Sequence, residues 1–201
     1  MTSQHSVAPN VEFHMLRDDM DNIPEYELPA GYRFRCYREG DERTWLDLHR
    51  AGEPFIEITP DLFQKQFASG ADILPERMFF VETADGAAAG CITAWWDKNR
   101  YGEDERGRIH WVIVHPDHRR LGIANAMMTQ AMKTLREHYR WALLGTSSGR
   151  PYAVKTYLNF GFYPDPNDFR DEDALAAWER VQAQIDHPLL RSTLAAVTRA
   201  E

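Results

Sequence analysis

One stretch of the chain, residues 108–124, constrains the fold more than any other. It reads RIHWVIVHPDHRRLGIA. The apolar run 111–114 predicts a strand that is buried on both faces of a sheet. Pro116 ends this strand, because proline has no N–H for a ladder hydrogen bond. A helix is predicted from about Leu121, because an apolar stripe follows at spacings of four and three: Ala124, Met128, Ala131 and Leu135.

The turn between this strand and this helix has the properties of a phosphate-binding site. The first N–H groups of a helix have no intrahelical partner, and the helix dipole is positive there. Gly122 lets a ligand approach the backbone, Ala124 keeps the second position small, and Arg119 and Arg120 add positive charge. An ordinary strand–helix junction has the same outline. The turn lacks the Gly-Lys-Ser/Thr ending of a Walker loop and the glycine triplet of a dinucleotide-binding loop.

The turn resembles the acyl-CoA signature of the GNAT N-acetyltransferases, Arg/Gln-x-x-Gly-x-Gly/Ala, which here runs from Arg119 to Ala124 after Val114-His-Pro116. A second segment, residues 153–162 (AVKTYLNFGF), resembles the A-x-x-x-Y-x-x-x-G-F segment of the same family. The two signatures are independent and occur in the family's order. The resemblance extends from about Gly31 to Tyr163.

This resemblance implies acetyl-CoA as the co-substrate. In the family, pantetheine lies between the central strand and the strand after the long helix. Backbone groups of Val112, Ile113 and Val114 are therefore expected to bind pantetheine, and an amide there to polarise the thioester carbonyl. The resemblance also implies that the turn holds the cofactor phosphates through Arg119, Arg120, Leu121, Gly122, Ile123, Ala124 and Asn125.

The catalytic residues expected from the resemblance and from chemistry are Tyr157 and His110. The Tyr157 phenol can donate a proton to the leaving CoA thiolate; a buried packing role is the alternative. His110, on the strand that leads to the cofactor, has the titration range of a general base; a histidine satisfied within the sheet is the alternative. Glu53 and Glu57 could line the amine pocket, although solvated loop carboxylates are commoner.

One position departs from the family pattern. Three residues before Ala153 the family often carries an asparagine that binds pantetheine, and this chain has Arg150. Either Ser147 and Ser148 make that contact, or Arg150 faces a CoA phosphate. Trp95 and Trp96 could form the floor of a pocket, but core packing is the commoner role of such residues.

The order of elements predicts an α+β fold with three α/β/α layers and a mixed, mainly antiparallel sheet that contains one parallel pair around the long helix. The predicted strands are 32–37, 78–82, 90–96, 108–114, 141–146 and one from 162; the predicted helices begin near Asp41, Thr59, Leu121 and Pro151, with further helices after the domain. We expect an N-terminal extension over residues 1–30, which packs loosely or covers an edge, a GNAT domain over 31–165 and a helical appendage over 166–201.

Composition excludes several classes of partner. A net charge of −8 for 201 residues argues against nucleic acid, whose phosphates need a basic face, and suits a cationic amine. Cys36 and Cys91 lie in strand-like runs and are expected to be buried free thiols. The histidines form no metal-ligand pattern, and His115 and His118 are expected on the turn surface. No long apolar segment occurs, so we expect a cytoplasmic protein without a membrane partner.

The sequence therefore predicts an N-acetyltransferase that moves the acetyl group of acetyl-CoA to a primary amine of a small molecule, by direct attack in a ternary complex. A protein N-terminal or lysine acetyltransferase would share every motif, and an inactive CoA-binding module would keep the phosphate turn. The acceptor loops, Ala51 to Phe67 and Asp97 to Gly107, carry no recognisable signature. An apolar stripe of Leu175, Trp178 and Ile185 is expected to pack on the domain or on a second copy, which suggests a homodimer.

Overall fold

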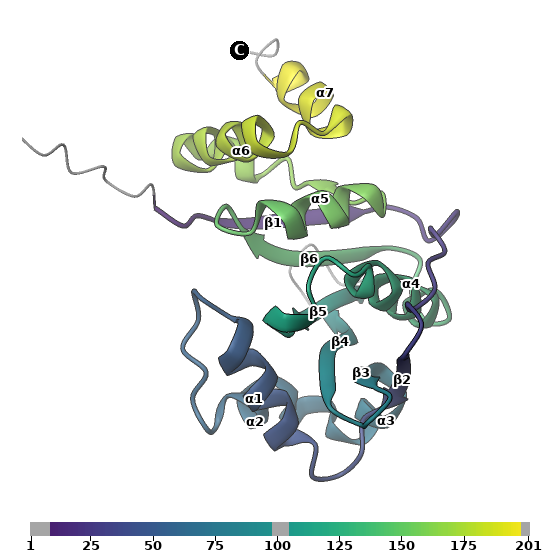
Figure 1. The fold of residues 1–201 in the computed structure, drawn as a ribbon. Helices are drawn as coiled ribbons and strands as arrows, with labels where there is room; N and C mark the ends of the chain where they lie inside the picture. The colour runs from purple at the N-terminus through teal and green to yellow at the C-terminus, as the bar shows by residue number, and fades with distance from the viewer. Residues whose placement is uncertain (1–8, 98–104, 198–201) are drawn as a thin grey trace, which may run out of the picture. The chain divides into compact units, whose positions relative to one another are not determined.

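The computed structural model describes residues 9–97 and 105–197 of the chain (Figure 1). These residues form two compact units. One unit is continuous in sequence, from Leu16 to Leu144. The other is discontinuous, because it combines the described residues up to Met15 with those from Gly145 onward.

The unit Leu16–Leu144 is built on antiparallel strands that follow one another in the sheet as in the chain. Its strands are β2 (Tyr32–Cys36), β3 (Met78–Thr83), β4 (Ala88–Asp97), β5 (Arg106–Val114) and the first half of β6 (Ala142–Ser147). Strands β2 to β5 pair antiparallel, whereas β5 and β6 pair parallel from Gly107–Ala142 to Ile109–Leu144. The prediction of a single parallel pair around the long helix is confirmed for the pairings described here.

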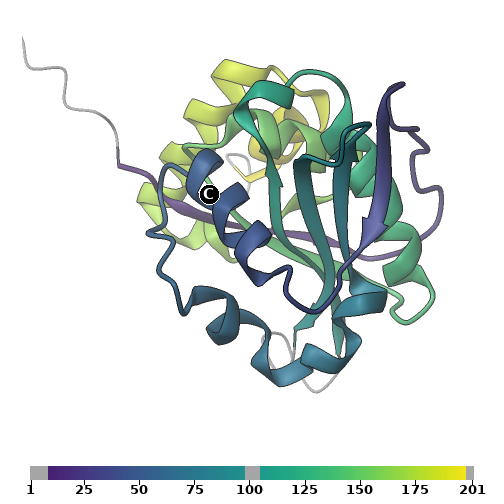
Figure 2. The same ribbon diagram turned by 60° about the horizontal axis from the view of Figure 1, so that its bottom comes forward.

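Helices cover both faces of these strands. They are α1 (Glu42–Gly52), α2 (Leu62–Phe67), the short α3 (Leu74–Arg77) and α4 (Ile123–Arg136), with a 3-10 helix over Ala68–Ile73. Figure 2 shows α1 and α2 on one side of β4 and β5 and α4 on the other. The strand pleat explains this arrangement, because a Cβ at Gly90 would meet Met127 of α4, whereas the next residue, Cys91, packs in the cluster with α1 and α2.

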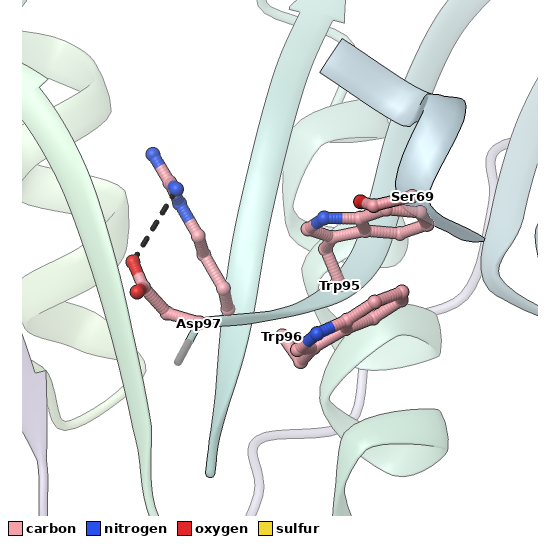
Figure 3. A pocket seen from close by; sticks show the side chains of 5 residues that line it. Ser69, Trp95, Trp96 and Asp97 are labelled. Atoms are coloured by element: carbon pink, nitrogen blue, oxygen red, sulfur yellow. Dashed lines mark hydrogen bonds and ion pairs between the residues drawn. The ribbon is translucent and has the colours of Figure 1, made fainter. Parts of the chain in front are cut away.

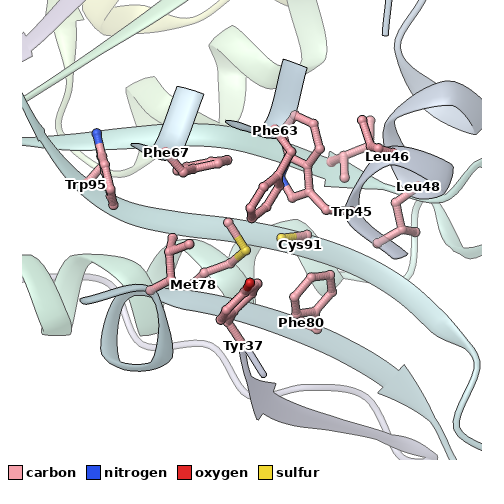
Figure 4. Close-up of a cluster of buried hydrophobic side chains, with 12 residues drawn as sticks. Tyr37, Trp45, Leu46, Leu48, Phe63, Phe67, Met78, Phe80, Cys91 and Trp95 are labelled. Atoms are coloured by element: carbon pink, nitrogen blue, oxygen red, sulfur yellow. The ribbon is translucent and has the colours of Figure 1, made fainter. Parts of the chain in front are cut away.

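The core beneath α1 and α2 is rich in aromatic residues (Figure 4). Trp45 is fully buried, and its ring contacts those of Phe63 and Phe67 at centroid distances of 5.4 and 5.7 Å. Phe67 in turn contacts Trp95 of β4 at 5.3 Å. Trp95 is thus a core residue, as the commoner alternative in the sequence indicated, while Trp96 is half-buried.

The second unit contains elements from both ends of the described chain. They are most of β1 (Glu12–Arg17), the end of β6, α5 (Pro151–Asn159), β7 (Tyr163–Pro164), α6 (Glu172–Ile185) and α7 (Pro188–Val197). Strand β1 was not predicted: residues 12–17 form a strand between β6 and β7 rather than a loose extension. Its apolar side chains Phe13 and Met15 are fully buried, and Phe13 stacks on Trp178 of α6 at 3.8 Å.

The predicted fold class is confirmed. The strands are ordered β2-β3-β4-β5-β6-β1-β7 in a mixed sheet with helices on both sides. The boundaries predicted at residues 30 and 165 do not coincide with those of the compact units. Trp178 and Ile185 are already buried in the single chain, so the stripe on α6 does not itself require a second copy, and the homodimer stays a prediction. No described helix has the length and apolar character needed to cross a membrane.

Candidate active site

The central strand β5 carries a bulge that the sequence did not predict. Thr93 of β4 lies opposite His110, but Cys91 lies opposite Ile113, so that two residues of β5 face one of β4. Within this bulge Trp111 has φ +47°, a left-handed conformation that costs a non-glycine residue about 1–3 kcal/mol. Strained residues of this kind concentrate at functional sites. The bulge interrupts the alternation that residues 111–114 were expected to follow.

A single side chain of α2 holds the two residues at the bulge. The indole Nε1 of Trp111 donates a hydrogen bond to Gln66 Oε1 at 3.0 Å, and His110 Nε2 lies 3.2 Å from the same oxygen. The Trp111 ring packs against Trp45 and His49 of α1 at centroid distances of 5.1 and 5.2 Å. Gln66 was not recognised in the sequence, because a lone glutamine on a short helix carries no signature.

Burial keeps both histidines near the bulge, His110 and His49, uncharged at neutral pH. Burial, with smaller effects of Arg108 and His49, lowers the pKa of His110 well below its ordinary value of 6.5. Burial likewise lowers the pKa of His49 to about 4. The expectation that His110 titrates in the usual range of a general base is therefore wrong for this structure. The imidazole of His110 is unprotonated at neutral pH, as a base must be before it accepts a proton.

The turn after β5 leaves backbone amides open at the start of α4. A 3-10 turn over Pro116–His118 follows β5, and Arg120 and Gly122 have φ of +63° and +85°. A Cβ built at Gly122 would meet no atom within 4 Å, and no described side chain caps this helix. The first-turn amides thus have no side-chain cap, and the space beside Gly122 is open, which are the conditions that a phosphate group needs. This geometry suits the predicted phosphate contacts at Gly122, Ile123, Ala124 and Asn125.

The two arginines of the turn differ in their surroundings. The Arg119 guanidinium donates to the carbonyls of Val114 at 3.1 Å and Gly52 at 2.8 Å, so it ties the end of β5 to the end of α1. Arg119 was expected to bind phosphate, whereas in this structure its guanidinium hydrogen-bonds to these two backbone carbonyls. Arg120 is exposed, and Leu121 beside it is 48% exposed.

Four further expected residues belong to the other compact unit. Tyr157 of α5 is 8% exposed, and burial raises the pKa of its phenol to about 12, which keeps the proton on the hydroxyl at neutral pH. The Arg150 guanidinium donates to Ser147 Oγ. Ser148 Oγ accepts from the amide of Val11 at 2.9 Å, so this hydroxyl anchors the start of β1. Whether Arg150 or the two serines contact CoA stays a prediction.

The remaining expectations fall on loops, cysteines and metal ligands. Glu53 Oε1 accepts from the amides of Phe55 at 2.7 Å and Ile56 at 3.2 Å, which gives it a role in shaping the loop, and Glu57 is exposed. Cys91 is buried as expected, but Cys36 is exposed because it lies at the end of the edge strand β2. The described residues contain no group of ligands that could hold a metal ion. Most of the second acceptor loop, residues 98–104, lies outside the described residues.

A cavity of about 320 Å³ lies at the end of β4 and the start of β5 (Figure 3). Its walls are Ser69, Trp95, Trp96, Asp97 and Arg108. The two indole rings stack at 4.1 Å, and Asp97 pairs with Arg108 at 3.4 Å. The Trp95 ring, which lines the cavity, also lies 6.5 Å from the ring of His110.

Comparison with solved structures finds proteins with the same fold. A GCN5-related N-acetyltransferase from Sphaerobacter thermophilus is 23% identical, with a TM-score of 0.61, over 78% of this chain and 49% of its own. A tandem GNAT protein from the clavulanic acid biosynthesis pathway is 18% identical, with a TM-score of 0.55, over 77% of this chain and 50% of its own. A GNAT-family acetyltransferase from Colwellia psychrerythraea is 13% identical, with a TM-score of 0.58, over 78% and 54%.

These likenesses show the fold, and the chain spans about half the length of the first two structures. No curated protein matches the chain. The model of the Acetyltransferase (GNAT) family matches residues 32–162, which is most of the chain and includes the bulge, the turn and α5. The chain belongs to the GNAT acetyltransferase family.

Proposed function

We propose that this protein transfers the acetyl group of acetyl-CoA to a primary amine of a small molecule, by direct attack in a ternary complex. The observation that carries the proposal is the turn before α4. There Gly122 combines a φ of +85° with open space above the first amides of the helix. The family generally uses acetyl-CoA as its co-substrate.

The residues of the turn and of β5 fit CoA in chemistry. Amides of Gly122, Ile123 and Ala124 can donate to the pyrophosphate, and exposed Arg120 adds charge beside them. Backbone groups of Val112 to Val114, next to the bulge, are proposed to bind pantetheine. Bound acetyl-CoA supplies the thioester whose acyl carbon reacts with the amine.

Proton movement assigns roles to two side chains. As the C–N bond forms and the C–S bond breaks, the amine loses a proton and the sulfur gains one. We assign the first proton to His110, which is neutral at pH 7, and the second to Tyr157, whose phenol holds its proton. Cysteine nucleophiles play no part in this scheme, because neither Cys36 nor Cys91 lies in either family signature.

The cavity beside Trp95 and Trp96 supports a small-molecule acceptor over a protein acceptor. Its volume of about 320 Å³ falls within the usual range for small-ligand pockets, roughly 300–1,000 Å³. The net charge of −8 also suits a cationic amine. A protein N-terminal or lysine acetyltransferase needs a groove for an extended peptide instead.

The test combines CoA binding with an acceptor screen. We expect calorimetry to detect binding of CoA, and a panel of small amines incubated with acetyl-CoA to release free thiol together with an acetylated product seen by mass spectrometry. Acetylation of peptides alone would favour the protein acetyltransferase. CoA binding without transfer to any amine would favour the inactive binding module, and absence of CoA binding would overturn the proposal.

A further inference from the structure

We propose that Gln66 is a positioning residue, which holds His110 with its proton on Nε2 and so leaves Nδ1 as the basic atom of the imidazole. The inference rests on the proposed function, in which His110 accepts the proton of the amine. It deepens that function by naming the atom that takes the proton and the side chain that selects it.

The argument begins with Trp111, because an indole N–H can only donate. Its Nε1 lies 3.0 Å from Gln66 Oε1, so this amide must present its oxygen, and not its nitrogen, to the bulge. His110 Nε2 lies 3.2 Å from the same oxygen. A carbonyl oxygen only accepts, so His110 Nε2 must carry the proton. In the neutral imidazole, the other nitrogen, Nδ1, then holds the free electron pair.

The bulge explains why one amide can serve two neighbouring residues. Consecutive side chains of a regular strand point to opposite faces of the sheet. The extra residue in β5 and the left-handed backbone of Trp111 bring His110 and Trp111 to the same face, where both contact the aromatic core beneath α1 and α2. Gln66 lies on α2 between Phe63 and Phe67. Both phenylalanine side chains are buried, so the packing of α2 fixes the backbone at Gln66.

The charged and titratable groups around His110 determine how strongly a charge at position 66 would change the pKa of the imidazole. On β5 itself Arg108 disfavours the imidazolium, and on α1 the buried His49 does the same. The described side chains that contact His110 from α2 and β4 are Gln66, Phe67 and Trp95, and none of these is ionisable. A carboxylate at position 66 would therefore be the one negative charge among the described contacts of His110.

The first experiment measures the tautomer directly and needs no acceptor. Nitrogen-15 NMR of the imidazole rings, with the His110 signals assigned by their loss in His110→Asn, should show the proton on Nε2 at pH 8. The preference should persist in Gln66→Glu, whose carboxylate still accepts, and be lost in Gln66→Leu. A proton on Nδ1 of His110 in the parent protein would overturn the inference.

The second experiment measures the pH dependence of kcat. On the acidic side of the pH profile, kcat falls as His110 becomes protonated, because only the neutral imidazole accepts a proton. Gln66→Glu should raise the pH midpoint of this acid limb by about 1 unit or more, because a nearby carboxylate stabilises the imidazolium. Gln66→Leu should lower kcat about 10-fold or more without that upward shift, because the ring loses its fixed proton position. The matched control is Gln64→Glu, which adds the same charge at an exposed site of α2. It should leave the pH midpoint of the acid limb unchanged.

The two experiments separate this inference from the proposed function. A parent protein without acetyl transfer contradicts the function, and the NMR result on the tautomer then still decides the role of Gln66 in holding the ring. An active parent whose acid limb is the same in Gln66→Glu as in Gln64→Glu would overturn the inference and leave the function intact.

Discussion

At the scale of single residues, the phenol of Tyr157 has the protonation state that the proposed donor role requires. It is buried in the unit that contains α5, and burial raises its pKa to about 12. A group with such a pKa keeps its proton at neutral pH, so the proposed transfer to sulfur takes place only as negative charge develops on the sulfur while the C–S bond breaks. The role assigned to it is thus confined to the transition state.

Tyr157→Phe tests this role, because the substitution keeps the ring and removes the proton. Turnover should fall about 10²–10⁴-fold, mostly in kcat, with the affinity for CoA little changed. Steady-state kinetics with an acceptor from the screen, or the slow hydrolysis of acetyl-CoA, provide the measurement. Equal turnover in the variant and the parent would show that Tyr157 is only a packing residue. Its ring centroid lies 6.4 Å from that of Phe162.

A second residue prediction concerns Gly122. Gly122→Glu should abolish CoA binding measured by calorimetry, because the new side chain enters the open space above the helix amides and carries a negative charge. The circular dichroism spectrum should stay close to that of the parent. Unchanged affinity for CoA would remove the turn from the site.

Gly40 provides the control for backbone strain. Its φ of +93° matches the +85° of Gly122, and a Cβ there also meets no atom within 4 Å. Gly40→Glu should therefore share the strain and the added charge but keep CoA binding. Loss of binding in both variants would point to destabilisation and not to the turn.

The residues proposed for the site were predictable to the extent that backbone chemistry or a family signature marks them. Gly122 and Tyr157 were identified because a glycine at a helix start and a tyrosine in a fixed pattern have recognisable spacings. Gln66 and the left-handed Trp111 were not, since a bulge depends on how β4 and β5 register against each other. The pKa of His110 also depends on burial by α2, which no local pattern reports.

At the scale of elements, α6 and β1 depend on each other. Trp178 of α6 is fully buried and stacks on Phe13 of β1 with an interplanar angle of 9°. Trp178→Ala should lower the free energy of unfolding by about 3–5 kcal/mol, the usual cost of deleting a large buried aromatic side chain. Urea unfolding followed by circular dichroism measures this change.

Tyr152→Ala serves as the comparison within the same unit. Tyr152 lies on α5 and is 80% exposed, so its removal should change stability by no more than about 0.5 kcal/mol. A loss from Trp178→Ala as small as that of the control would show that α6 contributes little to the unit.

The helices and long strands were predictable because their periodicity is local. Examples are the stripe of α4 and the run in β4, both close to the expected ranges. Strand β1 was missed, because Phe13 and Met15 are too few to set a clear period among polar neighbours. The partners that explain this strand, its sheet neighbours β6 and β7 and the packing residue Trp178, are all distant in sequence.

At the scale of the whole molecule, the buried histidines link stability to pH. The imidazole of His49 titrates near 6.5 in an unfolded chain and near 4 in the folded protein. The unfolded state therefore binds more protons between these values. The stability is complete above about pH 6.5 and is lost as the pH falls toward 4, by up to about 1.4 kcal/mol per unit for one histidine.

His49→Gln should reduce this dependence, because glutamine does not titrate. Urea unfolding at pH 7.5, 6.0 and 5.0 should show a shallower decline in the variant than in the parent, with the remainder due partly to His110, whose pKa is lowered in the same direction. Parallel declines in the two proteins would show that His49 is not neutral and buried in the folded state.

The predicted homodimer is tested by light scattering on the same samples.

The discontinuity of one compact unit has a consequence for synthesis on the ribosome. The residues Leu16–Leu144 can complete their own unit as soon as they have left the exit tunnel. The segment of β1 leaves the tunnel before this unit but cannot complete its packing, because its stacking partner Trp178 is synthesised more than 160 residues later. During translation the apolar side chains of Phe13 and Met15 are therefore uncovered. We expect them to make this segment a binding site for chaperones on the nascent chain until α6 has emerged.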